Sequence, residues 1–230
     1  MRSVIIIVLL MLASFTVSGQ HWIFSIGGNY GTYSMKSMEQ LQKNLKYNSE
    51  YPVKVVESFP SRPGFELSFM RTFKKNSIGA FLSTASTGGR LSYADYSGEL
   101  NYDLIVNMTS IAFNYEHTMV QKRWWELFIS LRNGISFNEL DITNEVRIGS
   151  ESASETERFE SKNITLYPGV GTRIFYQKFF LRPEIGYEAH IFKDNLRFKG
   201  REDAYLELNS TQFKAEWDGL RLSLHLGYRF

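Results

Sequence analysis

The residues with the clearest catalytic potential lie near the end of the sequence, where Ser223 and His225 are two positions apart. A serine hydrolase needs a serine nucleophile, a histidine general base and an orienting carboxylate within hydrogen-bond reach of one another. His190 is a second candidate base, and Glu184 or Glu188 is a candidate carboxylate. The parts of such a site are therefore present, and the elements that carry them decide whether they can act together.

Metal and thiol chemistry have little support in the sequence. The four histidines, at positions 21, 117, 190 and 225, share no ligand spacing of the kind that binds zinc. There is no cysteine, which excludes a disulfide framework, a cysteine nucleophile and a lipid-modified N-terminal cysteine. The formal net charge is only +2, which gives no electrostatic case for a nucleic-acid partner. We expect no metal and no cofactor.

The segment that carries Ser223 and His225 alternates without exception. Every second residue from Leu220 to Phe230 is leucine or aromatic, while the residues between them include Arg221, His225 and Arg229. This alternation predicts a β-strand with one apolar face and one polar face. Ser223 and His225 both fall on the polar face.

Two further segments show the same pattern, and in each the charged residues share one face. They are 179–192 and 124–137, with weaker examples at 65–73 and 165–174 and strand-like stretches at 22–33, 78–93 and 98–117. In the last of these the apolar positions change phase between Val106 and Ile111, which predicts a β-bulge. The total is about eight strands.

The links between these segments alternate in length. Short links lie at 74–76, 119–123 and 177–178, and long ones at about 34–63, 89–97, 139–161 and 193–218. Short turns on one side and long loops on the other are typical of outer-membrane barrels. We therefore predict an all-β fold: an antiparallel up-and-down transmembrane barrel.

The spacing of Met38, Leu41 and Leu45 predicts a short amphipathic helix within 35–46 of the first long loop. The Glu-, Ser- and Thr-rich stretch 151–160 is expected to be a mobile, solvated loop.

The first nineteen residues differ from the rest. One arginine precedes an apolar run from Val4 to Leu12, and small residues follow up to Gly19. This is typical of a cleaved secretory signal peptide, so we divide the chain into a signal peptide, 1–19, and a barrel, 20–230.

Aromatic residues make up 15% of the chain although its mean hydropathy is −0.25. That combination suits strands that expose only alternate residues to lipid.

A barrel of eight strands has an interior just wide enough for side chains. The polar faces should therefore meet inside it as a network of ion pairs that fills the lumen, because buried charges need partners. The alternative is a gated, narrow pathway in which the same pairs rearrange. The predicted lumen network consists of Glu66, Glu126, Arg132, Arg173, Arg182, Glu184, Glu188, His190, Arg221, His225 and Arg229.

The alternating last segment, its closing Tyr228-Arg229-Phe230 and the short-turn, long-loop rhythm resemble the small outer-membrane barrels of the OmpX, OmpA-membrane-domain and PorT-like type. The resemblance covers most of residues 21–230 and rests on architecture. It implies export, location in the outer membrane among lipid and lipopolysaccharide, and assembly by the outer-membrane assembly machinery, with Tyr228 and Phe230 as the assembly signal. It does not imply one activity, because similar barrels serve as adhesins, pores and lipid-modifying enzymes.

We expect a non-enzymatic barrel with a structural or interaction role through its long external loops, in contact with a protein partner. The loops contain apolar residues that could act as exposed anchors: Met38, Leu41, Leu45, Tyr205, Leu206, Leu208, Phe213 and Trp217. Alternatively, these loops pack on one another as a cap. Three competing hypotheses are a narrow pore or hydrophobic-solute transporter, a lipid A-modifying enzyme, and a soluble exported β-protein. A deacylase would need its catalytic groups to face lipid, whereas Ser223, His225 and His190 are expected to face the lumen.

Overall fold

Eight antiparallel strands form a closed ring in the computed structural model, which describes residues 20–201, 203–208 and 211–230. Each ring strand pairs with the next one in the chain, and the last pairs with the first, with Ile23 opposite Arg229. The ring strands are β1 (Gln20–Gly31), β3 (Pro63–Phe73), β4 (Asn76–Ala94), β5 (Glu99–Gln121), β6 (Trp125–Ile148), β7 (Glu151–Tyr176), β8 (Phe179–Lys193) and β12 (Gly219–Arg229). The predicted all-β, eight-stranded, up-and-down barrel is confirmed, whereas the predicted signal peptide lies outside the described residues.

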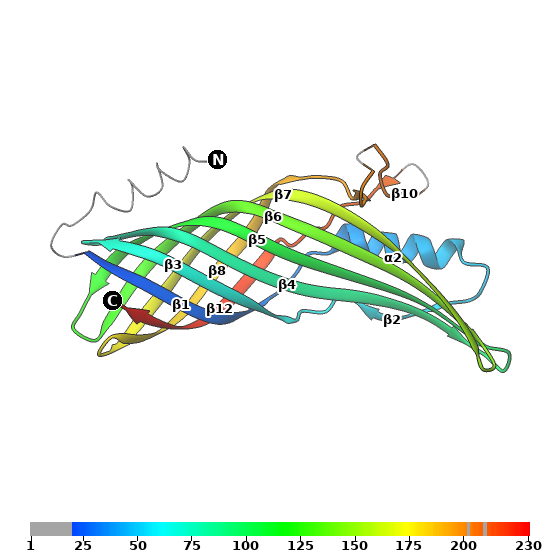
Figure 1. Cartoon of the computed structure of the whole chain (residues 1–230), viewed down its shortest axis with the longest axis horizontal. Coiled ribbons are helices and arrows are strands. Elements are labelled where there is room, and N and C mark those ends of the chain that lie inside the picture. Colours follow the sequence, from blue (N-terminus) through cyan, green and yellow to red (C-terminus); the bar gives the residue numbers. More distant parts are fainter. Residues whose placement is uncertain (1–19, 202, 209–210) are drawn as a thin grey trace.

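One end of the barrel has short turns. The links between β3 and β4, β5 and β6, and β7 and β8 are only two or three residues long. Lys74 and Gln177 adopt positive φ angles of 54° and 57° there, as tight hairpins require. β1 begins and β12 ends at this same end, which we call the short-turn end (Figure 1).

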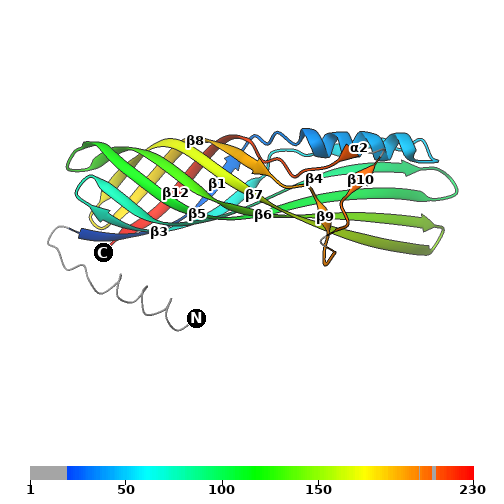
Figure 2. The same ribbon diagram turned by 90° about the horizontal axis from the view of Figure 1, so that it is seen from above.

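Four neighbouring strands continue far beyond the ring at the other end. β1, β3 and β12 have 11 or 12 residues, close to the roughly 9–11 that a tilted membrane strand needs. β4 to β7 have 19, 23, 24 and 26 residues. Their extra length forms a sheet that projects from the barrel (Figures 1 and 2).

A helix and two long segments cover one face of this projecting sheet. The helix α2 (Lys36–Asn48) confirms the predicted loop helix and lies alongside the extended strands (Figure 2). The strand β2 (Lys54–Ser58) adds to the edge of β4, and β9 (Arg197–Phe198) adds to β7. The short hairpin β10 (Glu207–Leu208) and β11 (Thr211–Gln212) follows. We call this assembly of projecting strands, helix and segments the cap.

The cap has its own hydrophobic core. Side chains from α2, the projecting strands and the 193–218 segment are fully or almost fully buried together, and they include Met38, Leu41, Leu104, Leu140, Phe159, Phe213 and Trp217. Gln42, on the same helix face, donates hydrogen bonds to the backbone carbonyls of Glu57 (2.7 Å) and Arg90 (3.4 Å). Burial of this apolar surface, rather than helix propensity, holds a helix of 13 residues in place.

The two faces of the long strands exchange character where the barrel meets the cap. On β5, the even positions from 100 to 118 all point inward, yet Leu104, Val106 and Met108 are apolar whereas Asn114 and Glu116 are polar. The outward positions change in the opposite sense, from Asp103 to exposed Ile111, Phe113 and Tyr115. In the cap the inward face of β5 is apolar, whereas in the barrel its outward face is apolar.

This exchange corrects the predicted bulge between Val106 and Ile111. The β5 register with β4 and β6 runs through that region without interruption, and the only shift in the β5–β6 ladder lies between Thr118 and Val120. The apolar residues change phase because the apolar environment moves from one side of the strand to the other.

Two of the four predicted long loops are mostly strand. β4 runs to Ala94, and β6 and β7 pair without interruption up to Ile148 opposite Glu151, so the predicted mobile loop 151–160 is part of β7. Residues 151–158 have exposed side chains on both faces of the strand, so the sequence shows no alternation of apolar and polar residues there. The main-chain ladder, supported by cross-strand pairs such as Thr143–Thr156 (3.0 Å), still holds the strand.

Candidate functional site

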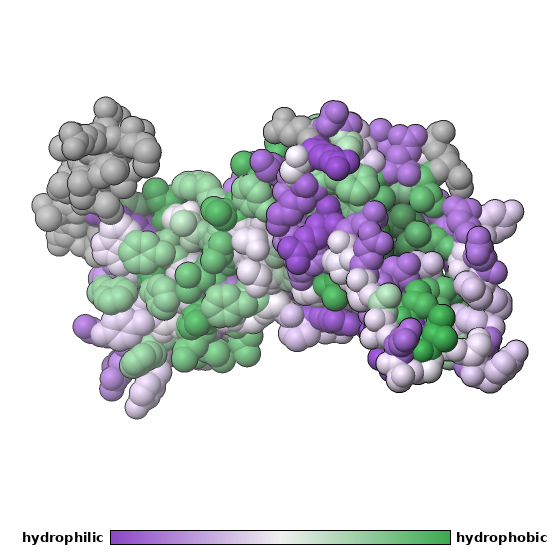
Figure 3. All heavy atoms as spheres, turned by 45° about the vertical axis from the view of Figure 1, so that its right-hand side comes forward, coloured by the Kyte–Doolittle hydropathy of each residue, from purple (hydrophilic) through white to green (hydrophobic). Residues whose placement is uncertain are grey.

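The outer wall of the barrel is an apolar belt to which every ring strand contributes. Its side chains are about 40–60% exposed, as in Ile26 of β1 (44%), Phe69 of β3 (46%), Phe113 of β5 (57%) and Leu226 of β12 (58%). Figure 3 shows this apolar surface over the barrel, whereas most of the cap surface is hydrophilic. A monomeric protein in water rarely exposes such an area, so the belt is suited to contact with lipid. Among the described residues, no helix has the length and hydropathy to cross a membrane.

The centre of the lumen holds a network of buried ion pairs. Arg182 lies between Glu116 (2.6 Å) and Glu184 (2.5 Å), and Arg132 binds Glu184 (2.6 Å). Arg173 pairs with Glu116. All five residues are less than 5% exposed. The network joins β5, β6, β7 and β8 from inside the ring.

Two other carboxylates extend this network. Glu126 lies 3.4 Å from Arg173, and Glu66 lies 3.8 Å from Arg132 and 2.7 Å from the His225 Nε2 atom. The network therefore reaches β3 and β12 on the opposite side of the ring. Four glutamates share three arginines and one histidine at this level of the described chain, which leaves little uncompensated charge.

Aromatic rings pack against the arginines of the network. The Arg132 guanidinium lies 3.7 Å from the centre of the Phe81 ring and 4.2 Å from that of Tyr167. Arg173 and Arg182 lie over Phe128 at 4.6 and 5.0 Å. Gly169 and Gly186 make room for Tyr167, because a Cβ atom at either position would lie less than 3 Å from its ring. These contacts fix the arginine side chains and fill the interior.

A second polar cluster lies where the lumen meets the cap. Arg221 donates hydrogen bonds to Glu188 (2.8 Å) and to the backbone carbonyl of Trp217 (2.8 Å). Asp218 accepts bonds from the His190 backbone N–H (2.7 Å) and from Lys193 (2.5 Å). Burial acts to raise the pKa of Asp218, which precedes the spanning part of β12, but its hydrogen bonds to His190 and Lys193 outweigh burial and lower that pKa.

Apolar layers lie on both sides of the polar network, although Glu126 also lines a recess at the short-turn end. Toward the cap lies the core that contains Trp217, which is fully buried. Toward the short-turn end, Ile23, Met70 and Phe180 form a cluster inside the ring, each no more than 4% exposed, and Phe175 packs against it. We call this cluster the lower plug. The lumen is thus a stack of apolar, charged and apolar layers.

The eleven predicted network residues divide into three groups. Glu66, Glu126, Arg132, Arg173, Arg182, Glu184 and His225 meet in the central network. Glu188, His190 and Arg221 belong to the second cluster, nearer the cap. Arg229 joins neither; it lies near the short-turn end, over the Phe175 ring at 4.7 Å.

The sequence analysis missed Glu116, although this residue binds two of the three central arginines. A signal was available: the inward positions after Met108 read Ser110, Ala112, Asn114 and Glu116. The interpretation of the phase change as a bulge left the inward face of this strand unassigned, and Glu116 with it.

The candidate hydrolase residues do not assemble as proposed. Ser223 is 6% exposed and no hydrogen-bond partner is present for its hydroxyl among the described residues, while Glu188 binds Arg221. His225 instead lies between Glu66 (2.7 Å) and Ser25 (3.4 Å), an acid–histidine–serine row. Ser25 is fully buried, and its hydroxyl forms a hydrogen bond with the Ser68 hydroxyl (2.7 Å). This row is therefore part of the buried polar network of the lumen.

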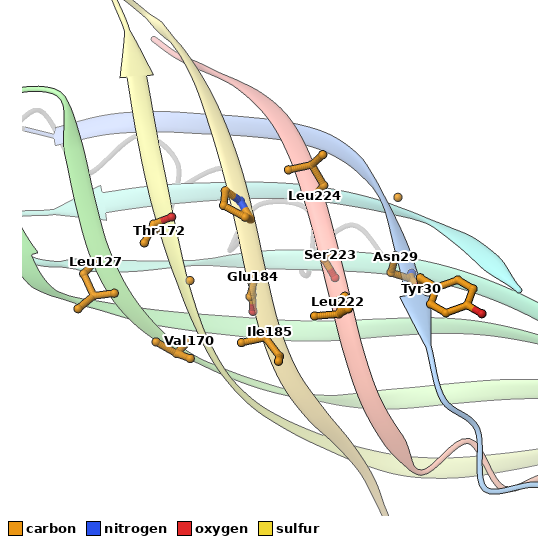
Figure 4. Close-up of a pocket in the computed structure, with 13 residues that line it drawn as sticks. Asn29, Tyr30, Leu127, Val170, Thr172, Glu184, Ile185, Leu222, Ser223 and Leu224 are labelled. Carbon is orange, nitrogen blue, oxygen red and sulfur yellow. The ribbon is translucent and has the colours of Figure 1, made fainter. Parts of the chain in front are cut away.

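The outer wall carries a shallow recess of about 770 Å³ across β7, β8, β12 and β1. Figure 4 shows Val170, Ile185 and Leu222 on its outward side. Glu184 and Ser223 come from the same strands but are buried on the lumen side. The recess lies within the apolar belt; its lining includes the strand positions of Glu184 and Ser223, but both residues are buried.

The predicted assembly residues lie on the rim at the short-turn end. The rings of Tyr228 and Phe230 are 5.0 Å apart, and Phe179 lies 5.1 Å from Tyr228. Trp22 stacks on Phe69 at 4.8 Å. Such an aromatic border at the edge of an apolar belt is typical of a membrane interface. A role in assembly stays a prediction.

The predicted loop anchors are mostly buried. Met38, Leu41, Phe213 and Trp217 are at most 1% exposed and Leu206 is 8% exposed, because they form the cap core; only Tyr205, at 39%, is exposed. The prediction that Met38, Leu41, Leu206, Phe213 and Trp217 are exposed anchors is therefore wrong. The loops pack as a cap, which was the alternative.

Other residues of the cap are exposed instead. Tyr47 and Tyr51 are 88% and 54% exposed and line a recess of about 530 Å³ after the end of α2. Val55 and Val56, on the edge strand β2, are 43% and 65% exposed. We call these four residues the cap patch. It lies at the free edge of the projecting sheet, where β2 pairs only with β4.

The comparisons with known proteins locate similar structures but no relative. No protein-family model matches the chain, and no curated protein matches its sequence. Solved structures similar to it include Ail, the attachment invasion locus protein of Yersinia pestis, with 16% identity, a TM-score of 0.41 and coverage of 91% of this chain and 98% of Ail.

Two further similar structures are NspA, the neisserial surface protein, and the outer membrane protease OmpT from Escherichia coli. NspA has 11% identity, a TM-score of 0.44 and coverage of 92% and 96%; OmpT has 12%, 0.44 and coverage of 94% and 98%. Matches this distant assign no activity, so the fold rests on the strand register and the apolar belt. By those criteria, the protein is an eight-stranded antiparallel barrel with the architecture of the small outer-membrane barrels of the OmpX and OmpA type.

Proposed function

We propose that the protein is a non-enzymatic barrel of the outer membrane whose cap stands outside the membrane and binds a protein partner through the cap patch. The apolar belt supports the membrane location, because its exposed side chains need lipid as a solvent. In the orientation common to such barrels, the short turns lie in the periplasm and the cap is external.

The observation that carries the interaction role is the contrast within the cap. Most of its large apolar residues are buried in two clusters, yet the cap patch leaves two tyrosines and two valines exposed on and beside the edge strand β2. Tyr96 and Ile148, at the tips of the projecting strands, are exposed as well. Tyrosine is enriched among residues that dominate binding energy, and an edge strand can pair with a partner strand. A rigid surface of this kind is suited to protein recognition.

The sealed lumen supports this proposal over a pore. The lower plug, the ion-pair network and the cap core lie in series along the barrel axis. An enzyme would need an accessible nucleophile, whereas Ser25 and Ser223 are both buried.

The membrane location is tested by fractionation of the cells that express the chain, followed by electrophoresis with and without boiling. We expect the protein in the detergent-extracted outer membrane, with a compact, heat-modifiable form. Removal of residues 1–19 should prevent export. A mature chain recovered from aqueous extract without detergent would contradict the proposal and favour a soluble β-protein.

The interaction role is tested by photocrosslinking in intact cells. A photoreactive amino acid replaces Tyr47 or Val56 in the cap patch, and Glu155, exposed on the projecting part of β7, as the matched control. We expect discrete protein adducts from the two patch positions only. Adducts from all three positions, or from none, would contradict a partner site at the cap patch.

The proposed assembly signal has its own test. Replacement of Phe230 by serine leaves the lumen network and the cap core untouched, because Phe230 is 62% exposed on the rim. If the assembly machinery reads Tyr228 and Phe230, the heat-modifiable fraction falls in cells, whereas refolding of the purified chain into detergent is unchanged. Leu226→Ser, in the same face, is the control.

A further inference from the structure

The turns at the short-turn end are strongly basic. They contribute Lys74 and Lys75 between β3 and β4, Lys122 and Arg123 between β5 and β6, and Lys178 between β7 and β8. No ion pair with a carboxylate of the described chain is formed by any of these five residues, although the protein forms many ion pairs elsewhere. Their charge is therefore available to a partner.

Part of this basic end surrounds a recess in the mouth of the barrel. The recess has a volume of about 300 Å³, and its lining includes Lys74, Lys75, Arg229 and His21. Arg229 packs over an aromatic ring and, like the turn lysines, has no carboxylate of the described residues within ion-pair distance. Two of the five turn cations, Lys74 and Lys75, thus share one concave site with Arg229.

Two apolar residues also line the recess. They are Phe175 and Ile23, which belong to the lower plug and its surroundings, and the polar residues Thr72 and Gln121 lie beside them in the lining. Glu126 is the acidic residue of the lining; it is only 8% exposed and already bound to Arg173 at 3.4 Å and Gln121 at 3.2 Å. The site therefore offers positive charge together with two apolar side chains.

The recess opens along the barrel axis and not toward the surrounding lipid. Its lining comes from β1 and β3 on one side and from β6 and β7 on the other, and β1 and β6 are opposite each other in the ring. A lipid headgroup outside the wall would meet the outer faces of the turns. A polypeptide in the aqueous space below the barrel can instead enter the mouth.

We propose that this mouth binds an acidic segment of a periplasmic polypeptide that carries an aromatic or aliphatic side chain. The carboxylates would pair with Lys74, Lys75 and Arg229, and the apolar side chain would contact Phe175. The inference rests on the proposed membrane orientation and adds a second partner surface, opposite the cap patch.

The test uses the full mature barrel in nanodiscs of uncharged phosphatidylcholine. The probe is a fluorescein-labelled ten-residue peptide that alternates Glu with Leu and Phe, and the control peptide has Gln in place of Glu. We expect saturable binding of the acidic peptide alone, weakened at high salt. Lys74→Glu with Lys75→Glu should weaken it more than about tenfold, whereas Lys36→Glu with Lys43→Glu, exposed on α2, should not.

Three outcomes would overturn the inference: equal binding of both peptides, equal binding to both double variants, or displacement of the peptide when phosphatidylglycerol enters the nanodisc. The last would identify the basic turns as contacts for anionic lipid.

The side of the membrane on which the short turns lie is measured separately with Lys75→Cys, the sole cysteine in that variant. Labelling by an impermeant maleimide only after permeabilisation supports the orientation. Labelling in intact cells would contradict the proposed function itself, whereas correct sidedness without peptide binding contradicts only this inference.

Discussion

At the scale of single residues, the lumen depends on arginines that each satisfy more than one carboxylate. Arg182 joins Glu116 on β5 to Glu184 on its own strand, and Arg132 joins Glu184 to Glu66 on β3. Removal of one arginine therefore takes one cationic partner from each of two buried glutamates. The loss is costly because these carboxylates are buried and have no water around them.

Arg182→Met should lower the free energy of unfolding by about 3–5 kcal/mol, because it removes one of the two arginines that bind each of the buried carboxylates Glu116 and Glu184. Arg158→Met is the matched control. Arg158 pairs with Asp141 at 3.5 Å on the exposed part of the cap, and its loss should change stability by less than about 1 kcal/mol. Urea titration in lipid vesicles, followed by tryptophan fluorescence, measures both. Equal effects would show that the buried network is not the stabilising element.

Asp218 predicts a pH dependence of the contact between cap and barrel. Its pKa is lower in the folded state than the roughly 3.9 of an unfolded aspartate. The stabilisation is therefore complete above about pH 4 and is lost as the pH falls through the lowered folded-state pKa. The stability difference between the wild type and Asp218→Asn should be large at pH 7 and shrink below pH 4. Asp203→Asn, exposed in the cap, serves as control; a constant difference would contradict the prediction.

At the scale of elements, the long strands serve two environments in turn. The inward face of β6 is polar at Ser136 and Asn138 and apolar at Leu140, while its outward face changes from Phe137 to Glu139. β5 changes at Met108 to Ser110 and β7 at Phe159 to Ser161. The changes occur at the same height on three neighbouring strands, which marks the border between the membrane part and the cap.

The cap should unfold without the barrel, because its core is separate from the lumen network. Leu41 is fully buried in that core, so Leu41→Ala should weaken the cap by about 2–5 kcal/mol. Limited proteolysis should then cut α2 or the 193–218 segment faster, while the heat-modifiable barrel remains. Lys43→Ala, exposed on the same helix, is the control. Loss of heat-modifiability in Leu41→Ala would instead show that cap and barrel fold as one unit.

At the scale of the whole molecule, the layers along the axis determine what can pass. A solute would cross the cap core, two polar clusters and the lower plug in turn. The outer surface is layered as well: Figure 3 shows an apolar belt over the barrel beside a cap that is mostly hydrophilic on this face. The turns at the short-turn end add five lysine and arginine residues. The proposed partner surfaces therefore lie at opposite ends of the molecule, with a filled interior between them.

We expect no stepwise ion conductance from the purified protein in planar lipid bilayers. The same should hold for Met70→Ala with Phe180→Ala, which removes the lower plug but leaves the ion-pair network in place. That double variant should still lose stability, by about 3–5 kcal/mol for the phenylalanine alone. Phe179→Ala, 52% exposed on the lipid side, is its control. Regular conductance steps from the wild type would contradict a closed lumen.

The sequence by itself determined the barrel and most of its interior. Strict alternation in 220–230, 179–192 and 124–137, with the weaker patterns in 65–73 and 165–174, placed ten of the eleven predicted network residues on the buried side of the wall. A period of two determines which face of the strand each residue takes. The helix in the first loop was also predictable, because its spacing of apolar residues requires a surface to cover.

Only the tertiary structure decided which apolar residues are free to bind. Trp217, Phe213 and Leu41 are residue types that often anchor protein partners. In the structure, however, α2 and the 193–218 segment pack against the projecting strands and bury all three in the cap core. It also decided that residues 139–161 are strands and that Glu116 completes the network. The physical reason is common to these cases: alternation reports that a strand has two different faces, but it does not report which environment, lipid, lumen or cap, lies on each side.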